Sequence, residues 1–185
     1  TRSETELKSD NFKSGRDTGN NQPELIIVGD GPEREALESL TSRLKPKADS
    51  LKPQNIHFFG KKPKNEVLLL MRHAQFFVFP SVWYETFGLT VVEAGLQGVP
   101  ALISNQSVAA SFIKESETGL CFKTGDVDDL ADKLVWAFSH PAEMERIGAQ
   151  AKQDFEAKYS AEVNYQQLMT VYNTPFLCRI STVRS

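Results

Sequence analysis

The chain has 185 residues, of which 40% are hydrophobic and 24% charged, with a formal net charge of −3. This composition predicts a folded domain with its own core and excludes a disordered chain or a disulfide-stapled mini-protein. The mild acidity argues against a nucleic-acid partner, and no apolar run approaches the ~18 residues of a membrane span. Cys121 and Cys178 are too isolated for a disulfide framework or a metal site, which favours reduced thiols and a cytoplasmic location.

Residues 1–22 are polar, and Leu7 and Phe12 are their only large apolar residues. We therefore expect a flexible lead-in or a surface loop. We expect the ordered domain over 23–173 and a tail over 174–185. The first strand is predicted at 24–28, a short apolar run that ends in a Gly/Pro-rich turn.

Strands and helices are predicted to alternate along the rest of the domain. The first helix is expected at 33–44, with Leu37, Leu40 and Leu44 at helical spacing. Further strands are expected at 55–59, 76–79, 99–103 and 120–122, and further helices at 65–74, 89–97, 126–139, 141–157 and 161–173. This order predicts an α/β fold with right-handed crossovers and a doubly wound parallel sheet. Ligands of such sheets bind at the carboxyl ends of the strands.

The turn Gly29–Arg34 only partly matches a dinucleotide-binding fingerprint. Arg34 stands where the third glycine belongs, and Pro32 lacks the N–H that a phosphate would bind. Glu33 and Glu35 in the first helical turn would repel an anion. The pattern therefore favours a plain strand-to-helix turn over an NAD site.

The strongest candidate site lies in the segment 80–95. A strand ends at Pro80, a loop carries Glu85, and a helix opens near Gly88 with Glu93 inside it. The free N–H groups of a helix start favour phosphate, whereas carboxylates accept hydrogen bonds from hydroxyl groups. A ligand with phosphates between two hydroxyl-bearing ends, a nucleotide-sugar, would match both features.

Glu85 and Glu93, separated by seven residues that include Phe-Gly-Leu, resemble the Glu-x7-Glu motif of retaining glycosyltransferases of the GT-B fold, family 4. The resemblance covers roughly residues 23–173. It extends through Gly29-Asp30-Gly31-Pro32, Ile56-His57-Phe58-Phe59-Gly60, Phe79-Pro80-Ser81, Glu93-Ala94-Gly95, Gly98-Val99-Pro100, Thr118-Gly119-Leu120 and Gly125-Asp126. It implies a Rossmann-like domain, one half of a GT-B fold, that binds the donor of a hexosyl transfer.

The resemblance also implies individual roles. Glu85 would be the catalytic residue, a carboxylate that faces hydroxyls of the donor sugar, and Glu93 would bind the ribose hydroxyls. The amides around Phe87, Gly88 and Leu89 would hold the distal phosphate, while Gly60 and Lys61 would line the base pocket. No metal and no cofactor besides the nucleoside diphosphate sugar is expected. The acceptor would bind to a missing N-terminal domain, so the isolated chain is expected to bind donor without turnover. The resemblance allows peripheral membrane contact of the parent protein.

Three features keep other interpretations open. Ser107, Val108 and Ser111 stand where the family has a Gly-Gly-x-x-Glu loop, and Gly15-Arg16 lacks the lysine that normally follows it. The alternatives are one half of a nucleotide-sugar 2-epimerase and a non-catalytic module that binds a nucleotide or a protein. Thr90 and Glu93 also match a capping box, which would give Glu93 a structural role. A glycosidase with two catalytic acids is disfavoured by the resemblance.

Overall fold

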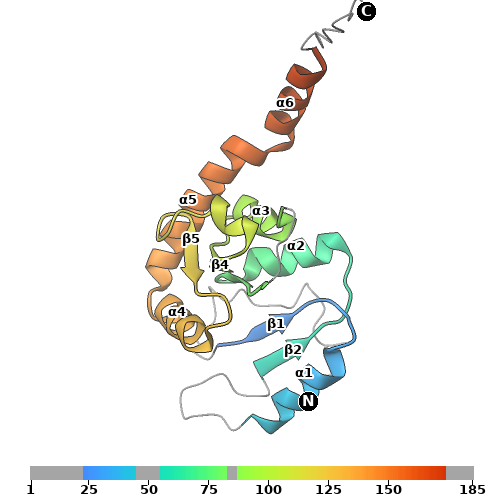
Figure 1. Cartoon of the computed structure of the whole chain (residues 1–185), viewed down its shortest axis with the longest axis vertical. Coiled ribbons are helices and arrows are strands. Elements are labelled where there is room, and N and C mark those ends of the chain that lie inside the picture. The colour runs from blue at the N-terminus through green and yellow to red at the C-terminus, as the bar shows by residue number, and fades with distance from the viewer. Residues whose placement is uncertain (1–22, 45–54, 83–86, 174–185) are drawn as a thin grey trace, which may run out of the picture.

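The computed structural model describes residues 23–44, 55–82 and 87–173 (Figure 1). The strands are β1 (Leu25–Ile27), β2 (Ile56–Phe58), β3 (Phe77–Phe79), β4 (Ala101–Ser104) and β5 (Gly119–Phe122). The helices are α1 (Arg34–Arg43), α2 (Lys64–His73), α3 (Leu89–Leu96), α4 (Val127–Ser139), α5 (Pro141–Tyr159) and α6 (Ala161–Asn173). A short 3-10 helix, η3 (Val108–Phe112), was not predicted. The predicted alternation of strands and helices is confirmed. The lead-in and the tail lie outside the described residues.

All strand pairs are parallel, as predicted, but they form two ladders. β1 pairs with β2, and β3, β4 and β5 form a second sheet in that order. In the view of Figure 1, β1 lies between β2 and the three-stranded sheet. Within the described residues, no ladder joins β1 to β3.

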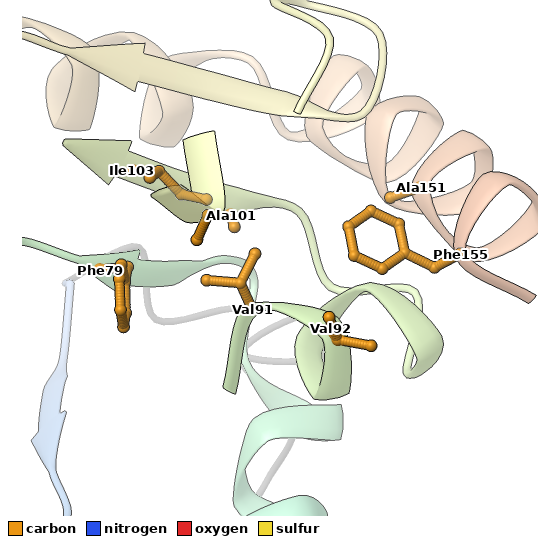
Figure 2. Close-up of a cluster of buried hydrophobic side chains, with 8 residues drawn as sticks. Phe79, Val91, Val92, Ala101, Ile103, Ala151 and Phe155 are labelled. Carbon is orange, nitrogen blue, oxygen red and sulfur yellow. The ribbon is translucent and has the colours of Figure 1, made fainter. Parts of the chain in front are cut away.

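Strand β4 is the centre of the core, because all four of its residues are buried. Ala101 and Ile103 face one cluster, with Val91 of α3 and Phe155 of α5 (Figure 2). Leu102 faces the opposite cluster, which contains Leu120, Ala137, Met144 and Ile147. Helices thus cover both faces of this strand, the arrangement that a doubly wound fold requires.

Helices α3 and α5 pack closely because a glycine lies at their contact. A Cβ atom at Gly95 would lie 2.7 Å from the ring of Phe155, which is itself 2% exposed. Burial of such an aromatic side chain stabilises a fold by about 1.5–3 kcal/mol. The contact holds α3, and with it Glu93, firmly on the body of the domain.

Helix α1 lies at the edge of the structure and has no buried residue. Its predicted apolar stripe is present but uncovered, with Leu37 at 43% exposure, Leu40 at 58% and Leu44 at 44%. At the other end of the chain, α6 extends away from the body of the molecule (Figure 1).

Candidate functional site

The turns after β1 and β2 are joined by a main-chain hydrogen bond. The N–H of Gly29 donates to the carbonyl of Gly60 over 2.8 Å. Gly60 has a φ of +63°, so its backbone conformation favours glycine. The predicted base-lining loop is therefore held against the first strand-to-helix turn.

That first turn is occupied by its own side chains. The N–H of Gly31 donates to the Asp30 carboxylate over 3.0 Å, and Nε of Arg34 donates to Glu38 over 2.8 Å. An amide and a cation that a phosphate would need are thus already engaged. The arrangement agrees with a plain strand-to-helix turn.

A run of lysines follows Gly60. Lys61 is exposed, whereas the ammonium of Lys62 lies 5.9 Å from the ring centre of Phe59 and 3.9 Å from the Glu66 carboxylate. Lys64, the first residue of α2, is turned toward α3 instead. Its Nζ atom lies 2.7 Å from Oε1 of Glu93.

This ion pair brings two predicted parts of the site together. Glu93 is 25% exposed and Lys64 is 76% exposed. The loop that starts at Gly60 therefore ends beside the Glu93 carboxylate. Within the described residues, Lys64 is the one charged partner of Glu93. The sequence pattern did not single out Lys64, because no local spacing links it to a residue on the next helix.

The start of α3 has a geometry that favours a bound anion, and no carboxylate lies in its first turn. Gly88 is the N-cap, with φ +73° and ψ +50°, and no acidic residue occupies the first turn. The N–H of Val91 donates to the Gly88 carbonyl over 2.9 Å, and the amides before Val91 start the helix. Such leading N–H groups have no intrahelical partner and favour negative charge. Leu89 and Thr90 beside them are exposed.

One expectation about this helix start is corrected. The N-cap is Gly88 and makes no side-chain cap, so Thr90 lies inside the helix and the capping-box interpretation of Glu93 is wrong. Gly88 is also needed for packing. A Cβ there would lie 2.6 Å from Cβ of the buried Ala109, so the glycine lets η3 approach α3.

The side chain of Phe87 packs against two half-buried aromatic rings. Its ring centre lies 5.0 Å from that of Phe112 in η3 and 6.1 Å from that of Tyr159 in α5. Phe87 is 40% exposed and Leu89 is 65% exposed. Any contact of Phe87 with phosphate would therefore come from its main chain.

The segment that stands in place of the Gly-Gly-x-x-Glu loop forms the short helix η3 and its cap. Ser107 caps η3 by accepting from the N–H of Ala109 over 3.2 Å, and Ser111 donates to the Val108 carbonyl over 2.7 Å. Both hydroxyls are thus used within η3. Glu85, the predicted catalytic residue, lies outside the described residues.

The described ranges hold no group of three His, Cys, Asp or Glu side chains placed to bind a metal ion. No helix in these ranges is long and apolar enough to cross a membrane. A hollow lined by Ser116, Leu120, Asp132, Lys133 and Trp136 includes none of the predicted donor-site residues.

The fold is that of a Rossmann-like half of a GT-B glycosyltransferase. The family model described as Glycosyl transferases group 1 matches residues 7–154, and the chain belongs to this family.

Named relatives agree with this membership. The chain is 28% identical to 2-deoxystreptamine N-acetyl-D-glucosaminyltransferase of Niallia circulans, over 82% of this chain and 37% of the relative. It is 30% identical to the phosphatidyl-myo-inositol mannosyltransferase of Mycobacterium leprae, over 82% of this chain and 38% of the relative. The chain therefore spans less than half the length of these relatives.

Solved structures share the fold. HepE of Anabaena, in complex with UDP and glucose, superposes with a TM-score of 0.68 at 21% identity, over 82% of this chain and 41% of that protein. A glycosyltransferase of Rickettsia africae superposes with a TM-score of 0.70 at 19% identity, over 83% of this chain and 40% of that protein.

Proposed function

We propose that this chain is the donor-binding half of a retaining glycosyltransferase that transfers a hexosyl group from a nucleoside diphosphate sugar. The observation that carries the proposal is that α3 holds both a carboxylate, Glu93, and a helix start whose free N–H groups favour an anion. Glu93 lies on α3 one turn after the amides at Gly88, and Lys64 contacts it from the neighbouring helix. Family membership supports sugar transfer, and the fold is shared with a protein solved with UDP and glucose.

In this proposal, each part of the donor meets a different group. Glu93 accepts hydrogen bonds from the ribose hydroxyls, and the amides from Phe87 to Leu89 bind the distal phosphate. The loop at Gly60 and Lys61 lines the base. Glu85 faces the hydroxyls of the donor sugar. The positive end of the α3 dipole and the charge of Lys61 would stabilise the negative charge of the diphosphate leaving group. The proposed chemistry therefore needs no bound metal or further cofactor.

The acceptor would bind to polypeptide outside this chain, in a further N-terminal domain. We therefore expect the isolated chain to bind donor and to form no glycoside. The transfer would take place in the cytoplasm, with peripheral membrane contact through the parent protein where the acceptor is a lipid.

Calorimetric titration with UDP, GDP and UDP-glucose tests the proposal. We expect Glu93→Gln to weaken the preferred nucleotide by about 10-fold or more, since a hydrogen bond to a charged group contributes about 1.5–3 kcal/mol. Glu156→Gln, which removes an exposed carboxylate on α5, is the matched control and should leave affinity unchanged. Absence of binding by all three ligands to a folded chain would overturn the proposal.

One observation favours a second function, a non-catalytic nucleotide- or protein-binding module. The loop at Ser107–Ser111 is a capped 3-10 helix without the family's glycines and acid. Hydrolysis of UDP-glucose or GDP-mannose by the full-length parent distinguishes the two functions. A parent that binds donor but neither hydrolyses nor transfers it would be the module.

A further inference from the structure

Ser104, the last residue of β4, connects this strand to the chain that leaves β3. Ser104 is fully buried, and its hydroxyl group donates a hydrogen bond to the main-chain carbonyl of Ser81. The register of β3 and β4 ends at the pair Phe79 and Ile103, so this bond extends the contact beyond the paired residues. It lies at the carboxyl ends of the strands, where ligands of such sheets bind.

The turn after Ser104 is attached to the neighbouring strand β5. The N–H of Asn105 donates to the carbonyl of Phe122 over 2.8 Å, and the side chain of Asn105 accepts from the N–H of Thr124 over 3.1 Å. The hydroxyl of Thr124 accepts from the N–H of Gln106 over 3.2 Å. Because several bonds join this turn to β5, Ser104 is a fixed point to which another segment can be attached.

The chain that leaves β3 returns to the same part of the molecule. The ring centre of Phe87 lies 5.0 Å from that of Phe112 in η3. Residues 83–86 lie outside the described part of the chain. The described residues on the two sides of this gap therefore both contact the segment 104–112, through Ser81 on one side and Phe87 on the other.

We propose that Ser104 is a positioning residue for the donor sugar, an inference that rests on the proposed function. In that function Glu85 faces the sugar hydroxyls, and Glu85 follows Ser81 by four residues in the sequence. The hydrogen bond from Ser104 fixes the point at which the chain leaves β3, and with it the direction from which Glu85 reaches the donor. Displacement of a binding group by about 1 Å costs much of its effect. Ser104 acts through Ser81 and not by contact with the donor.

This role differs in its consequences from a role in stability alone. In the proposed function, Glu93 and the amides at the start of α3 bind the ribose and the phosphate, and Ser104 contacts neither group of residues in the described hydrogen bonds. Loss of the Ser104 hydroxyl should therefore affect the sugar and spare the nucleotide. General loss of stability would instead weaken both ligands alike.

Calorimetric titration of the 185-residue chain measures this selectivity. The ligand pairs are UDP with UDP-glucose and GDP with GDP-mannose. For the pair that binds, we expect Ser104→Ala to weaken the nucleotide-sugar by about 5-fold relative to its nucleoside diphosphate. Ser104→Thr keeps a hydroxyl donor and should keep the wild-type ratio of the two affinities. If Ser104→Ala does not fold, Ser104→Cys, which has a similar volume and a weak donor, replaces it with the same expected loss.

Thr118→Ala is the matched control. Thr118 is 1% exposed, and its hydroxyl accepts from the N–H of Lys114 over 2.9 Å. It directly precedes β5 and thus lies at the amino ends of the strands, away from the candidate site. The variant removes a buried, hydrogen-bonded hydroxyl and should leave the ratio of the two affinities unchanged.

A double-mutant cycle tests whether the effect of Ser104 passes through Glu85. In a Glu85→Ala background, Ser104→Ala should cause no further loss of affinity for the nucleotide-sugar, because the group that Ser104 positions is then absent. Equal losses with and without Glu85 would overturn the proposal. A loss that the nucleotide-sugar and the nucleoside diphosphate share equally would also overturn it.

A measurement without ligand separates this inference from the proposed function. The heteronuclear NOE of the Ser81 and Val82 amides reports motion on the ps–ns timescale. We expect it to fall in Ser104→Ala and to stay at the wild-type value in Ser104→Thr, whereas an unchanged value in Ser104→Ala would overturn the anchor. A folded wild-type chain that binds none of the four ligands would overturn the proposed function, and a fall in the NOE at Ser81 would then still support the anchor.

Discussion

Nζ of Lys64 lies 2.7 Å from Oε1 of Glu93, and this contact joins the first residue of α2 to the middle of α3. Lys64 is 76% exposed, and exposed ion pairs contribute only about 0–1 kcal/mol to stability. The pair therefore matters for the direction of the Glu93 carboxylate rather than for the stability of the fold.

Replacing Lys64 should weaken nucleotide binding without unfolding the chain. We expect Lys64→Met to reduce the affinity for UDP or GDP about 3–10-fold, because the Glu93 side chain loses the partner that orients it. Calorimetry and thermal unfolding measure the two effects. Lys152→Met, which removes an exposed lysine of α5 near Glu156, is the matched control. Tighter binding by Lys64→Met would mean that the lysine competes with the ribose instead.

The two glutamates of the motif should differ in the ligands they affect. Glu93→Ala should weaken the nucleoside diphosphate and the nucleotide-sugar alike, by about one to two decades, because both carry the ribose. Glu85→Ala should weaken only the nucleotide-sugar. Four calorimetric titrations, each variant with each ligand, measure the difference. Unchanged affinities for Glu93→Ala would exclude the ribose assignment.

Gly88→Ala should lower the free energy of unfolding for two separable reasons. The φ of +73° costs an L-residue about 1–2 kcal/mol, and overpacking against Ala109 costs about 1–3 kcal/mol more. Gly125→Ala is a control for the first cost, since its φ is +77° and no atom lies within 4 Å of the new Cβ. Urea unfolding measures both variants.

The overpacking can be tested by relieving it. Ala109→Gly in the Gly88→Ala background should recover part of the lost stability, since the atom that the new Cβ meets is then absent. Equal losses for Gly88→Ala and Gly125→Ala would contradict the contact between η3 and α3.

Cys121 should resist alkylation until the solution is strongly alkaline. Burial, followed by the charge of Glu115, raises the pKa of the Cys121 thiol from 9.0 to about 11. The thiolate is the reactive form, so its reaction with iodoacetamide should accelerate mainly as the pH approaches 11. A Cys178→Ser variant isolates the signal, and urea-unfolded protein, where the thiol has its ordinary pKa, is the control.

The same shift predicts a loss of stability with rising pH. Below pH 9 the thiol is protonated in both states and contributes no difference. Between the unfolded pKa of 9.0 and the folded value of about 11, the unfolded state releases its proton first, so the free energy of unfolding falls. A Cys121→Ala variant should lack this component. An identical alkaline profile for both proteins would contradict the buried thiol.

Local sequence signals were sufficient for the order of strands and helices. Runs such as Phe76–Phe79 are apolar on both faces, and Gly and Pro residues stop them, so each strand could be predicted from its own residues. Strand β4 is buried on both sides, as its uninterrupted apolar run predicted. Placing Glu93 on a helix that follows a glycine start needed no tertiary information either.

Contacts between distant residues decided the rest. That Gly88 makes room for Ala109 depends on the approach of η3, a short helix beyond α3 and β4 that no local pattern predicted. The pairing of Lys64 with Glu93 and the division of the described strands into two ladders depend on which helices and strands become neighbours. The sequence alone determined which elements form and what chemistry they carry, because propensity and periodicity are local properties. Only the tertiary structure decided which groups meet, because strand order and helix packing are set by burial summed over the whole chain.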